Sequence, residues 1–510
     1  MAMAREEHGR IVDYPDEFEV CIIGSGIAGT VLGRDLVSHG VKTAVLESGT
    51  GIMRWLLDGR MKRLAAYTVS GDIGYPTERT KARLLGGNSN FWTGRCERYH
   101  PSDLQNHPYT PPGNPWPLTY EELVPHYERA ERTLRVRGGE PSAHAAPRRN
   151  RYPIAPRTDI SGLQAMFARV GVTLDDSPTA TPAKALRFFR VQKEILPAFT
   201  ASRHATLLTN LTVTRLEADG QGRIVGAQAR SLEGKAVVIR ARVYVVACGG
   251  IETPRLLLLS RSPEFPNGIG NRYGRVGRGF NEHPGVNFYA RIRHQRETLV
   301  PRHKIARSHQ FYDQFRKEGL GSVLPVVIQS WVFPHHLIRP KLSDLPKSLA
   351  SLLGRTVRPT LYIGATIEML PDDDNRVTLS GRAADMFGSP LAELSFSYTD
   401  QDRRTLARTR ELILDIYRRL DAAEISEAEV TWSRHHIGTC RMGSDPKSSV
   451  TDPTLRVHDS PNLYLCGSET FPTGAAVPPV LTIVALAHRL SDHLAARLRH
   501  QPASGPESGA

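Results

Sequence analysis

The sequence predicts an α/β protein, α+β overall, in which a Rossmann-like dinucleotide-binding domain is joined to a substrate domain built on an antiparallel sheet. The chain has 510 residues, which is too long for one ordinary hydrophobic core, so two domains are expected. A strand–turn–helix–strand unit lies near the N-terminus, at 17–47. Residues 287–430 contain several stretches in which apolar and polar residues alternate, as they do in half-buried antiparallel strands.

The N-terminal unit reads, in succession, E-V-C-I-I, G-S-G-I-A-G, T-V-L-G-R-D-L-V-S-H-G and T-A-V-L. Gly24 permits the tight turn, Gly26 lets the backbone approach a pyrophosphate, and Gly29 lets the helix pack close to the sheet. The helix N-terminus then faces the phosphate charge. Glu47 ends the second strand, where an acid accepts ribose hydroxyls. The unit predicts dinucleotide binding, and the motif alone does not choose FAD over NAD.

Composition narrows the class of protein. The formal net charge is +14, but the basic residues form no stripe with aromatic residues, so we do not expect nucleic-acid binding. The five cysteines are an odd number without a CxxC pair, which argues against a disulfide framework or a zinc site and suits the cytoplasm. The N-terminus has no apolar signal core, and no run approaches the ~20 apolar residues of a spanning helix. We therefore expect a cytoplasmic protein with no metal site and no membrane segment.

Further elements are predicted along the chain. An amphipathic helix follows the cap residue Thr119, and another helix is expected near 183–200. Residues 205–260 predict a β-meander, followed by a buried strand that enters a second Gly turn. A long amphipathic helix is expected over Thr399–Leu420, and the polar tail Gln501–Ala510 is expected to be disordered.

The C-terminal segment Ser433 to His493 combines a histidine pair with a Gly-rich turn. It reads S-R-H-H-I-G-T-C, then an apolar strand at Leu463–Cys466, a Gly/Pro-rich bend and an apolar helix from about Val480. A titratable histidine beside a tight turn is a suitable place for proton chemistry. A structural histidine would give the same pattern, so its meaning depends on the cofactor that the N-terminal unit predicts.

This segment, the N-terminal turn and the blocks at 83–95, 205–260 and 276–285 resemble the GMC oxidoreductases, the flavin-dependent glucose–methanol–choline family. The likeness is greatest to the bacterial sugar dehydrogenase and pyranose oxidase branch. It implies an FAD-binding domain of the GMC or glutathione-reductase type and hydride transfer from an alcohol to flavin N5. His435, three residues before Gly438, takes the position of the family's catalytic base. Its neighbour His436 is the weaker candidate.

The resemblance also implies contacts with FAD. Some pyranose oxidases carry, just before the Trp of the 83–95 block, a His that is covalently bonded to FAD. This chain has Phe91 before Trp92, so we expect noncovalent FAD. His283 is expected near the domain junction, in a structural rather than a catalytic role. The implied FAD contacts are Gly24, Gly26, Gly29, Glu47, Gly86, Gly87, Asn88, Ser89, Asn90, Val213, Ala247, Gly250, Gly467, Ser468 and Pro479.

The family pattern divides the chain into parts that alternate between the two domains. The expected FAD-binding domain is assembled from three of these parts, with substrate-side segments between them. The order is 1–99 (FAD-binding), 100–204 (substrate-side insertion or lid), 205–286 (FAD-binding), 287–430 (substrate-binding), 431–500 (FAD-binding, with the catalytic His) and 501–510 (disordered tail).

One residue departs from the family pattern. Pro478 stands directly before Pro479, where the family normally has Asn or His as the second polar group on the substrate hydroxyl. Proline offers neither a side-chain donor nor an N–H. Three interpretations stay open. His436 or a residue of the substrate domain supplies the contact, one histidine suffices at a lower rate, or the site has lost oxidation and kept FAD.

The predicted function is FAD-dependent oxidation of a sugar or glycoside hydroxyl to an aldehyde or ketone. The narrowest interpretation is an enzyme of aminoglycoside antibiotic biosynthesis that acts on the 6'-hydroxyl of a paromamine-like substrate. The positive net charge argues against a polycationic substrate unless acidic residues line the pocket. The alternative is a non-oxidative flavoprotein on the same fold, either lyase-type or redox-inert. Oxygen, a quinone and a carrier protein are the candidate electron acceptors.

Overall fold

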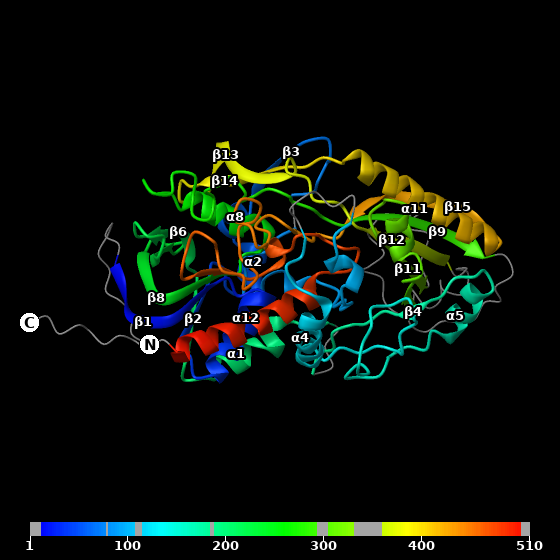
Figure 1. Cartoon of the computed structure of the whole chain (residues 1–510), viewed down its shortest axis with the longest axis horizontal. Coiled ribbons are helices and arrows are strands. Elements are labelled where there is room, and N and C mark those ends of the chain that lie inside the picture. Colours follow the sequence, from blue (N-terminus) through cyan, green and yellow to red (C-terminus); the bar gives the residue numbers. More distant parts are fainter. Residues whose placement is uncertain are drawn as a thin grey trace, which may run out of the picture.

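The computed structural model describes residues 12–77, 80–107, 115–183, 188–292, 304–330 and 360–500. In these ranges the strands form sheets of seven, six and three strands (Figure 1). None of the helices in the same ranges is long and apolar enough to cross a membrane. The expected disorder of Gln501–Ala510 lies outside the described residues.

The seven-stranded sheet carries the dinucleotide turn. Its order is β5-β2-β1-β8-β7-β6, with β16 beside β8. The pairs among β5, β2, β1, β8 and β16 are parallel, whereas β6, β7 and the first part of β8 form an antiparallel meander. The predicted βαβ unit, meander and buried strand are therefore confirmed. The strands are β1 Val12–Ile23, β2 Thr43–Glu47, β5 Ala205–Thr209, β6 Thr212–Ala218, β7 Ile224–Arg230, β8 Ala236–Val246 and β16 Leu463–Leu465.

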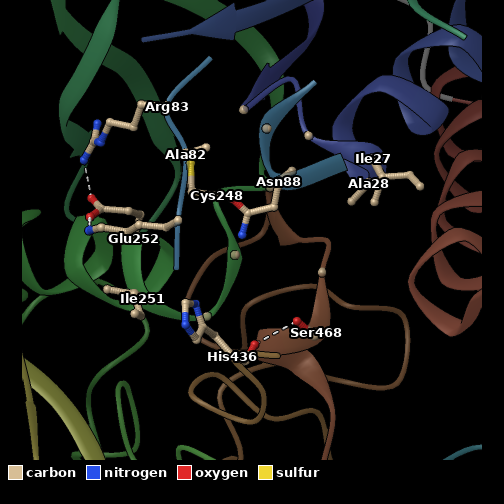
Figure 2. Close-up of a pocket in the computed structure, with 18 of the residues that line it drawn as sticks. Ile27, Ala28, Ala82, Arg83, Asn88, Cys248, Ile251, Glu252, His436 and Ser468 are labelled. Carbon is tan, nitrogen blue, oxygen red and sulfur yellow. Dashed lines mark hydrogen bonds and ion pairs between the residues drawn. The ribbon is translucent and has the colours of Figure 1, made fainter. Parts of the chain in front are cut away.

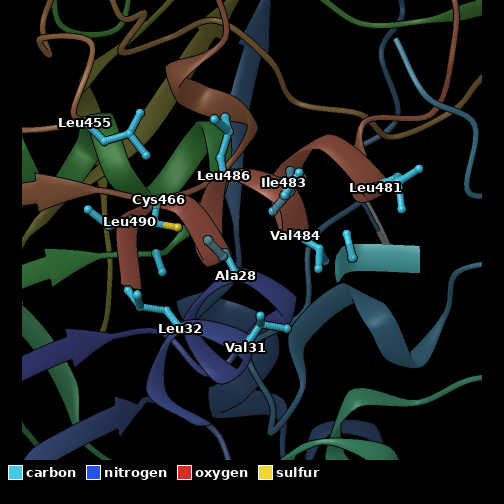
Figure 3. Close-up of a cluster of buried hydrophobic side chains, with 14 of the residues drawn as sticks. Ala28, Val31, Leu32, Leu455, Cys466, Leu481, Ile483, Val484, Leu486 and Leu490 are labelled. Atoms are coloured by element: carbon cyan, nitrogen blue, oxygen red, sulfur yellow. The ribbon is translucent and has the colours of Figure 1, made fainter. Parts of the chain in front are cut away.

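Two helices fix the turn on this sheet. α1 (Ile27–Ser38) follows β1 and packs along α12 (Val480–His500), which in turn packs against α4 (Tyr120–Thr133). Figure 3 shows apolar side chains of α1 and α12 gathered in one cluster. Leu32 of α1 is among the fully buried ones, and the burial of each such side chain contributes about 1.5–3 kcal/mol to the stability of the fold. This packing holds the N-terminus of α1 in place.

The six-stranded sheet is antiparallel in the order β15-β9-β12-β11-β10-β4, as predicted for the substrate domain. α11 (Asp400–Arg419) covers it, and the hydroxyl of Tyr417 on α11 donates to carbonyls of β9 and β12. Thr399 and Asp402 form a capping box that starts α11, so the predicted helix is confirmed. The strands are β4 Asp175–Asp176, β9 Pro284–Ile292, β10 Lys304–Arg307, β11 Val323–Ser330, β12 Thr360–Ile367 and β15 Ala422–Trp432.

Two strands of the 287–430 region leave this sheet. β13 (Arg376–Ala384) and β14 (Pro390–Ser395) join β3 (Tyr67–Ser70) in the three-stranded sheet, where β14 runs parallel to β3. The single helix predicted near 183–200 is wrong in its described part. Two short helices, α6 (Val191–Glu194) and α7 (Leu196–Thr200), meet there because Pro197 lacks the N–H that would continue α6.

Several shorter helices complete the described ranges. α8 (Gly249–Leu259) begins at the second Gly turn, directly after β8. The others are α2 Ile52–Leu57, α3 Gly59–Leu64, α5 Ser161–Ala168, α9 Tyr312–Lys317 and the 3₁₀ turns η1 Gly87–Asn90, η2 Pro101–Leu104 and η4 Ser468–Thr470.

Candidate active site

A cavity of about 600 Å³ is lined by residues from both large sheets. Gly29, Gly86 and Asn90 are the predicted site residues that do not line it. Pro478 lines it next to Pro479. The predicted site residues that do line it are His435, His436, Gly24, Gly26, Glu47, Gly87, Asn88, Ser89, Val213, Ala247, Gly250, Gly467, Ser468 and Pro479.

The dinucleotide turn has room for a phosphate. Gly24 has φ +108°, and a Cβ there would lie 2.5 Å from the carbonyl oxygen of Ala247. A Cβ at Gly29 would lie 2.0 Å from the carbonyl oxygen of Gly24, so helix and turn touch backbone to backbone. At Gly26 a Cβ would meet nothing within 4 Å, because the chain opens onto the cavity. No side chain caps α1, which leaves its first N–H groups to bind an anion. These features fit the pyrophosphate of a dinucleotide.

Glu47 stands at the end of β2, on the same cavity as Val213. Its carboxylate accepts hydrogen bonds from the N–H of Ser25 at 3.1 Å, the hydroxyl of Ser25 at 2.7 Å and the N–H of Gly49 at 2.8 Å. The acid is therefore held in place by the turn itself. Its contact with a ribose stays a prediction.

A cluster of charges that was not predicted from the sequence lines the cavity. Glu252 of α8 pairs with Lys81, Arg83 and Arg255, and Figure 2 shows the pair with Arg83. Although burial raises the pKa of Glu252, the three cations hold it well below its usual range. Burial lowers the pKa of Lys81 to about 8, against the opposing effect of Glu252. Lys81 and Arg83 are far from Glu252 in the sequence, so no local motif marks this cluster.

His435 is held by a second histidine. Its Nδ1 lies 2.9 Å from Nδ1 of His283, and Nε2 of His283 lies 3.1 Å from the carbonyl oxygen of Gly474. A carbonyl only accepts, so Nε2 of His283 carries the proton and its Nδ1 accepts. Nδ1 of His435 must then carry the other proton. The Nε2 of His435 is left with a lone pair, and no hydrogen bond from the described residues reaches it.

The loop that carries His435 is fixed by a buried carboxylate. Glu282 accepts hydrogen bonds from the N–H groups of His283, Arg434 and His435 at 3.0, 3.0 and 2.6 Å. Burial raises the pKa of Glu282 to about 7, although these bonds lower it. Arg434 has φ +63°, a strained conformation that the carboxylate helps to hold. Neither Glu282 nor its role was predicted from the sequence.

His436 is used differently from its neighbour. Its Nε2 lies 3.1 Å from the hydroxyl of Tyr75, which also donates to Glu282. The ring packs against Tyr75 and Phe280, and the hydroxyl of Ser468 donates to the main-chain carbonyl of His436 (Figure 2). His436 lines the cavity, but its Nε2 is already hydrogen-bonded to Tyr75.

The three histidines are neutral at pH 7. Burial lowers the pKa of His283 to about 4 and that of His436 to about 3. Burial also holds the pKa of His435 well below its usual value, and the neighbouring basic groups His283, His436 and Arg307 act in the same direction. A neutral imidazole whose lone pair has no hydrogen-bond partner can accept a proton. Together with the dinucleotide turn, this arrangement fits an enzyme that moves a proton beside a bound dinucleotide.

Comparison with known proteins identifies the family. GMC oxidoreductase models match residues 187–285 and 371–487. The large subunit of fructose dehydrogenase from Gluconobacter japonicus is 26% identical over 93% of this chain and 97% of its own length. Paromamine 6'-oxidase from Streptomyces fradiae is 27% identical over 94% of this chain and 92% of its own. The chain belongs to the GMC oxidoreductase family, and its cofactor is FAD.

The fold agrees with this family. The crystal structure of pyridoxine 4-oxidase from Mesorbium loti superimposes with a TM-score of 0.67 at 19% identity, over 95% of this chain and 100% of that one. The expected FAD-binding Rossmann-like domain and sheet-based substrate domain are therefore present.

Proposed function

We propose that this enzyme oxidises a hydroxyl group of a sugar or glycoside, with His435 as the base that takes the hydroxyl proton. One observation carries the proposal. Neutral His435 lines the same cavity as the dinucleotide turn, and its Nε2 has no hydrogen-bond partner among the described residues. Bound FAD supplies the hydride acceptor, flavin N5. The turn at Gly24–Gly29 and the N-terminus of α1 would hold its pyrophosphate.

The chain's own residues prepare the proton transfer. As Nε2 of His435 takes the proton, its Nδ1–H bond to His283 becomes charge-assisted and stronger. His283 passes the polarisation to the carbonyl of Gly474, and Glu282 keeps the His435 backbone in place. The product is the aldehyde or ketone, after loss of one proton to His435 and one hydride to the cofactor.

The names of the relatives support a polyhydroxylated substrate. One relative is named for fructose and another for the 6'-position of paromamine, which supports the narrower prediction of a paromamine-like substrate. The charge of the cavity opposes that narrower prediction, because acidic side chains do not dominate its described lining. The acids are Glu47, Glu252 and Asp385, and the bases are Lys81, Arg83, Arg95, Arg255, Arg307 and Arg434.

Pro478 leaves the second polar contact to another residue. Thr366 of the substrate sheet lines the cavity together with His435. This supports the interpretation in which the substrate domain supplies that contact. His436 is a weaker substitute, since its Nε2 already bonds to Tyr75.

Anaerobic mixing with fructose, paromamine, simple glycosides and sugar acids tests the function, because oxidation of a hydroxyl bleaches the flavin. His435→Ala should keep FAD and slow flavin reduction by ~10²–10⁴-fold, the usual contribution of a positioned base. His436→Ala is the matched control and should cost much less. A non-oxidative flavoprotein would show no bleaching with any hydroxyl compound. Reoxidation of the reduced enzyme by oxygen and by a soluble quinone then separates an oxidase from a dehydrogenase.

A further inference from the structure

Two arginines line the cavity from the substrate side. Arg307 is the last residue of β10, and Arg95 lies in an extended segment that bridges to Thr179. Both guanidinium groups contact the hydroxyl of Ser177, Nη1 of Arg95 at 2.6 Å and Nε of Arg307 at 3.1 Å. The two positive charges are therefore neighbours, and together with burial this lowers the pKa of Arg95 to about 10.

Most of the hydrogen-bonding capacity of Arg307 is unused. Its Nε pairs with Glu97 at 2.6 Å, and no described residue accepts a hydrogen bond from Nη1 or Nη2. The residue is only 5% exposed, so water does not supply the missing partners freely. A buried guanidinium with unmatched N–H groups is costly unless a ligand completes it.

The acids near the pair do not face the cavity. Glu97 contacts Arg307, and Asp176 lies near Arg95, where it accepts the N–H of Gly139. Neither acid is among the residues that line the cavity, whereas both arginines are. A ligand in the cavity therefore meets the arginines and not these acids.

Arg307 belongs to the substrate end of the cavity. It is on the six-stranded sheet, whereas the dinucleotide turn and Glu47 are on the seven-stranded sheet. Arg307 and His435 line the same cavity, and Arg307 is one of the groups that lower the pKa of that imidazole. A group bound by Arg307 would therefore share this cavity with the reacting hydroxyl.

We propose that Arg307, assisted by Arg95, forms an anion-binding subsite beside His435, and that the substrate carries a carboxylate, as uronic and aldonic acids do. A planar guanidinium matches a carboxylate in shape and charge, and such a charge-assisted bond is worth about 10- to 150-fold in affinity. The same charges repel ammonium groups, which disfavours a polyamine such as paromamine. The oxidation of this acid rests on the proposed function, whereas the binding of the carboxylate does not.

Unreactive probes of equal ring size test the subsite without turnover. Cyclohexanecarboxylate, cyclohexanecarboxamide and cyclohexylamine have no hydroxyl to oxidise, and their binding to the FAD-loaded enzyme is followed by the shift of the flavin absorbance. The carboxylate should bind at least 10-fold more tightly than the amide, and the amine should bind weakest. Arg307→Gln should remove this preference and Arg307→Lys should retain part of it. Arg410→Gln, which removes a surface charge paired with Glu427, should change nothing.

Flavin reduction by glucuronate, glucose and glucosamine then connects binding to oxidation. The ratio of reduction rate to KM should fall in that order, and Arg307→Gln should cost glucuronate about 10-fold or more and glucose little. Equal binding of the carboxylate and the amide overturns the subsite, as does an unchanged preference in Arg307→Gln or a loss of FAD from that variant. A carboxylate preference without any flavin reduction keeps the subsite and refutes the proposed function. Flavin reduction without a carboxylate preference supports the proposed function and refutes the subsite.

Discussion

Replacing His283 by leucine should slow proton transfer without disturbing the cofactor. His283 contacts neither the dinucleotide turn nor the described cofactor end of the cavity, and it acts through the 2.9 Å bond to His435. The bond fixes the tautomer of His435 that has its lone pair on Nε2. The role is one of positioning, because His283 is buried behind His435 and does not line the cavity.

The size of the effect follows from the change in that bond during the reaction. A bond between neutral groups contributes about 0.5–1.5 kcal/mol, and a bond to a charged group about 1.5–3 kcal/mol. The Nδ1–H of His435 changes from the first kind to the second as the imidazolium forms. Only this difference, about 1–1.5 kcal/mol, accelerates the chemical step. His283→Leu should therefore lower the rate of flavin reduction about 5- to 13-fold, with KM and flavin content unchanged.

Anaerobic stopped-flow reduction of the flavin measures this directly. His283→Asn restores an acceptor near the position of Nδ1 and should recover part of the rate, while thermal unfolding checks that both variants are folded. A loss as large as that of His435→Ala would show that His283 is itself the base. A loss below about 2-fold would show that the tautomer of His435 is set by something else.

Four further predictions concern the cofactor and pH. Acid precipitation should release yellow flavin into the supernatant, because Phe91 cannot form the covalent bond of a His; flavin in the pellet would contradict this. Gly26→Val should fold but remain colourless, since its side chain fits the structure and occupies the phosphate's space; full flavin occupancy would exclude the turn as the binding site. In Glu282→Gln, whose side chain cannot titrate, the flavin reduction rate should stay constant from about pH 8 down to about pH 6.5, because burial holds the pKa of His435 below its usual value; a fall beginning near pH 6.5 would refute this. Between about pH 6.5 and about pH 4 the free energy of unfolding should decline less in His283→Leu than in the parent protein, because there the unfolded parent chain binds a proton that buried His283 does not; an equal decline in both would contradict this.

The parts of the fold that the sequence predicts correctly are those set by nearby residues. The Gly24–Gly29 turn joins a strand to the helix directly after it, and the capping box at Thr399 lies within one helical turn. The helix expected near 183–200 fails at Pro197, although the apolar residues around it suit a helix. β13 and β14 show the right strand period, but only the pairing of β14 with β3 decides which sheet they join.

The substrate end of the cavity is assembled from residues that are remote in sequence. Arg95 and Arg307 meet at Ser177, and the pairing of β10 with β4 brings Arg307 beside Asp175. No spacing between two positions more than two hundred residues apart marks such a contact. The same limit applies to the pairing of Glu252 with Lys81 and Arg83.

The hydrogen bonds of His435 and His436 distinguish the two side chains better than the sequence does. His435 and His436 are adjacent and chemically identical, and only the spacing from Gly438 favoured the first. In the structure each ring has one nitrogen bonded to the protein, but the partners differ. The hydroxyl of Tyr75 donates its only proton to Glu282, so Nε2 of His436 carries a proton and donates to Tyr75. His435 meets His283, whose proton is fixed by a carbonyl that can only accept, and this fixes the vacant nitrogen as Nε2. The reactive tautomer of His435 is therefore determined by the carbonyl of Gly474, which is connected to His435 through two successive hydrogen bonds.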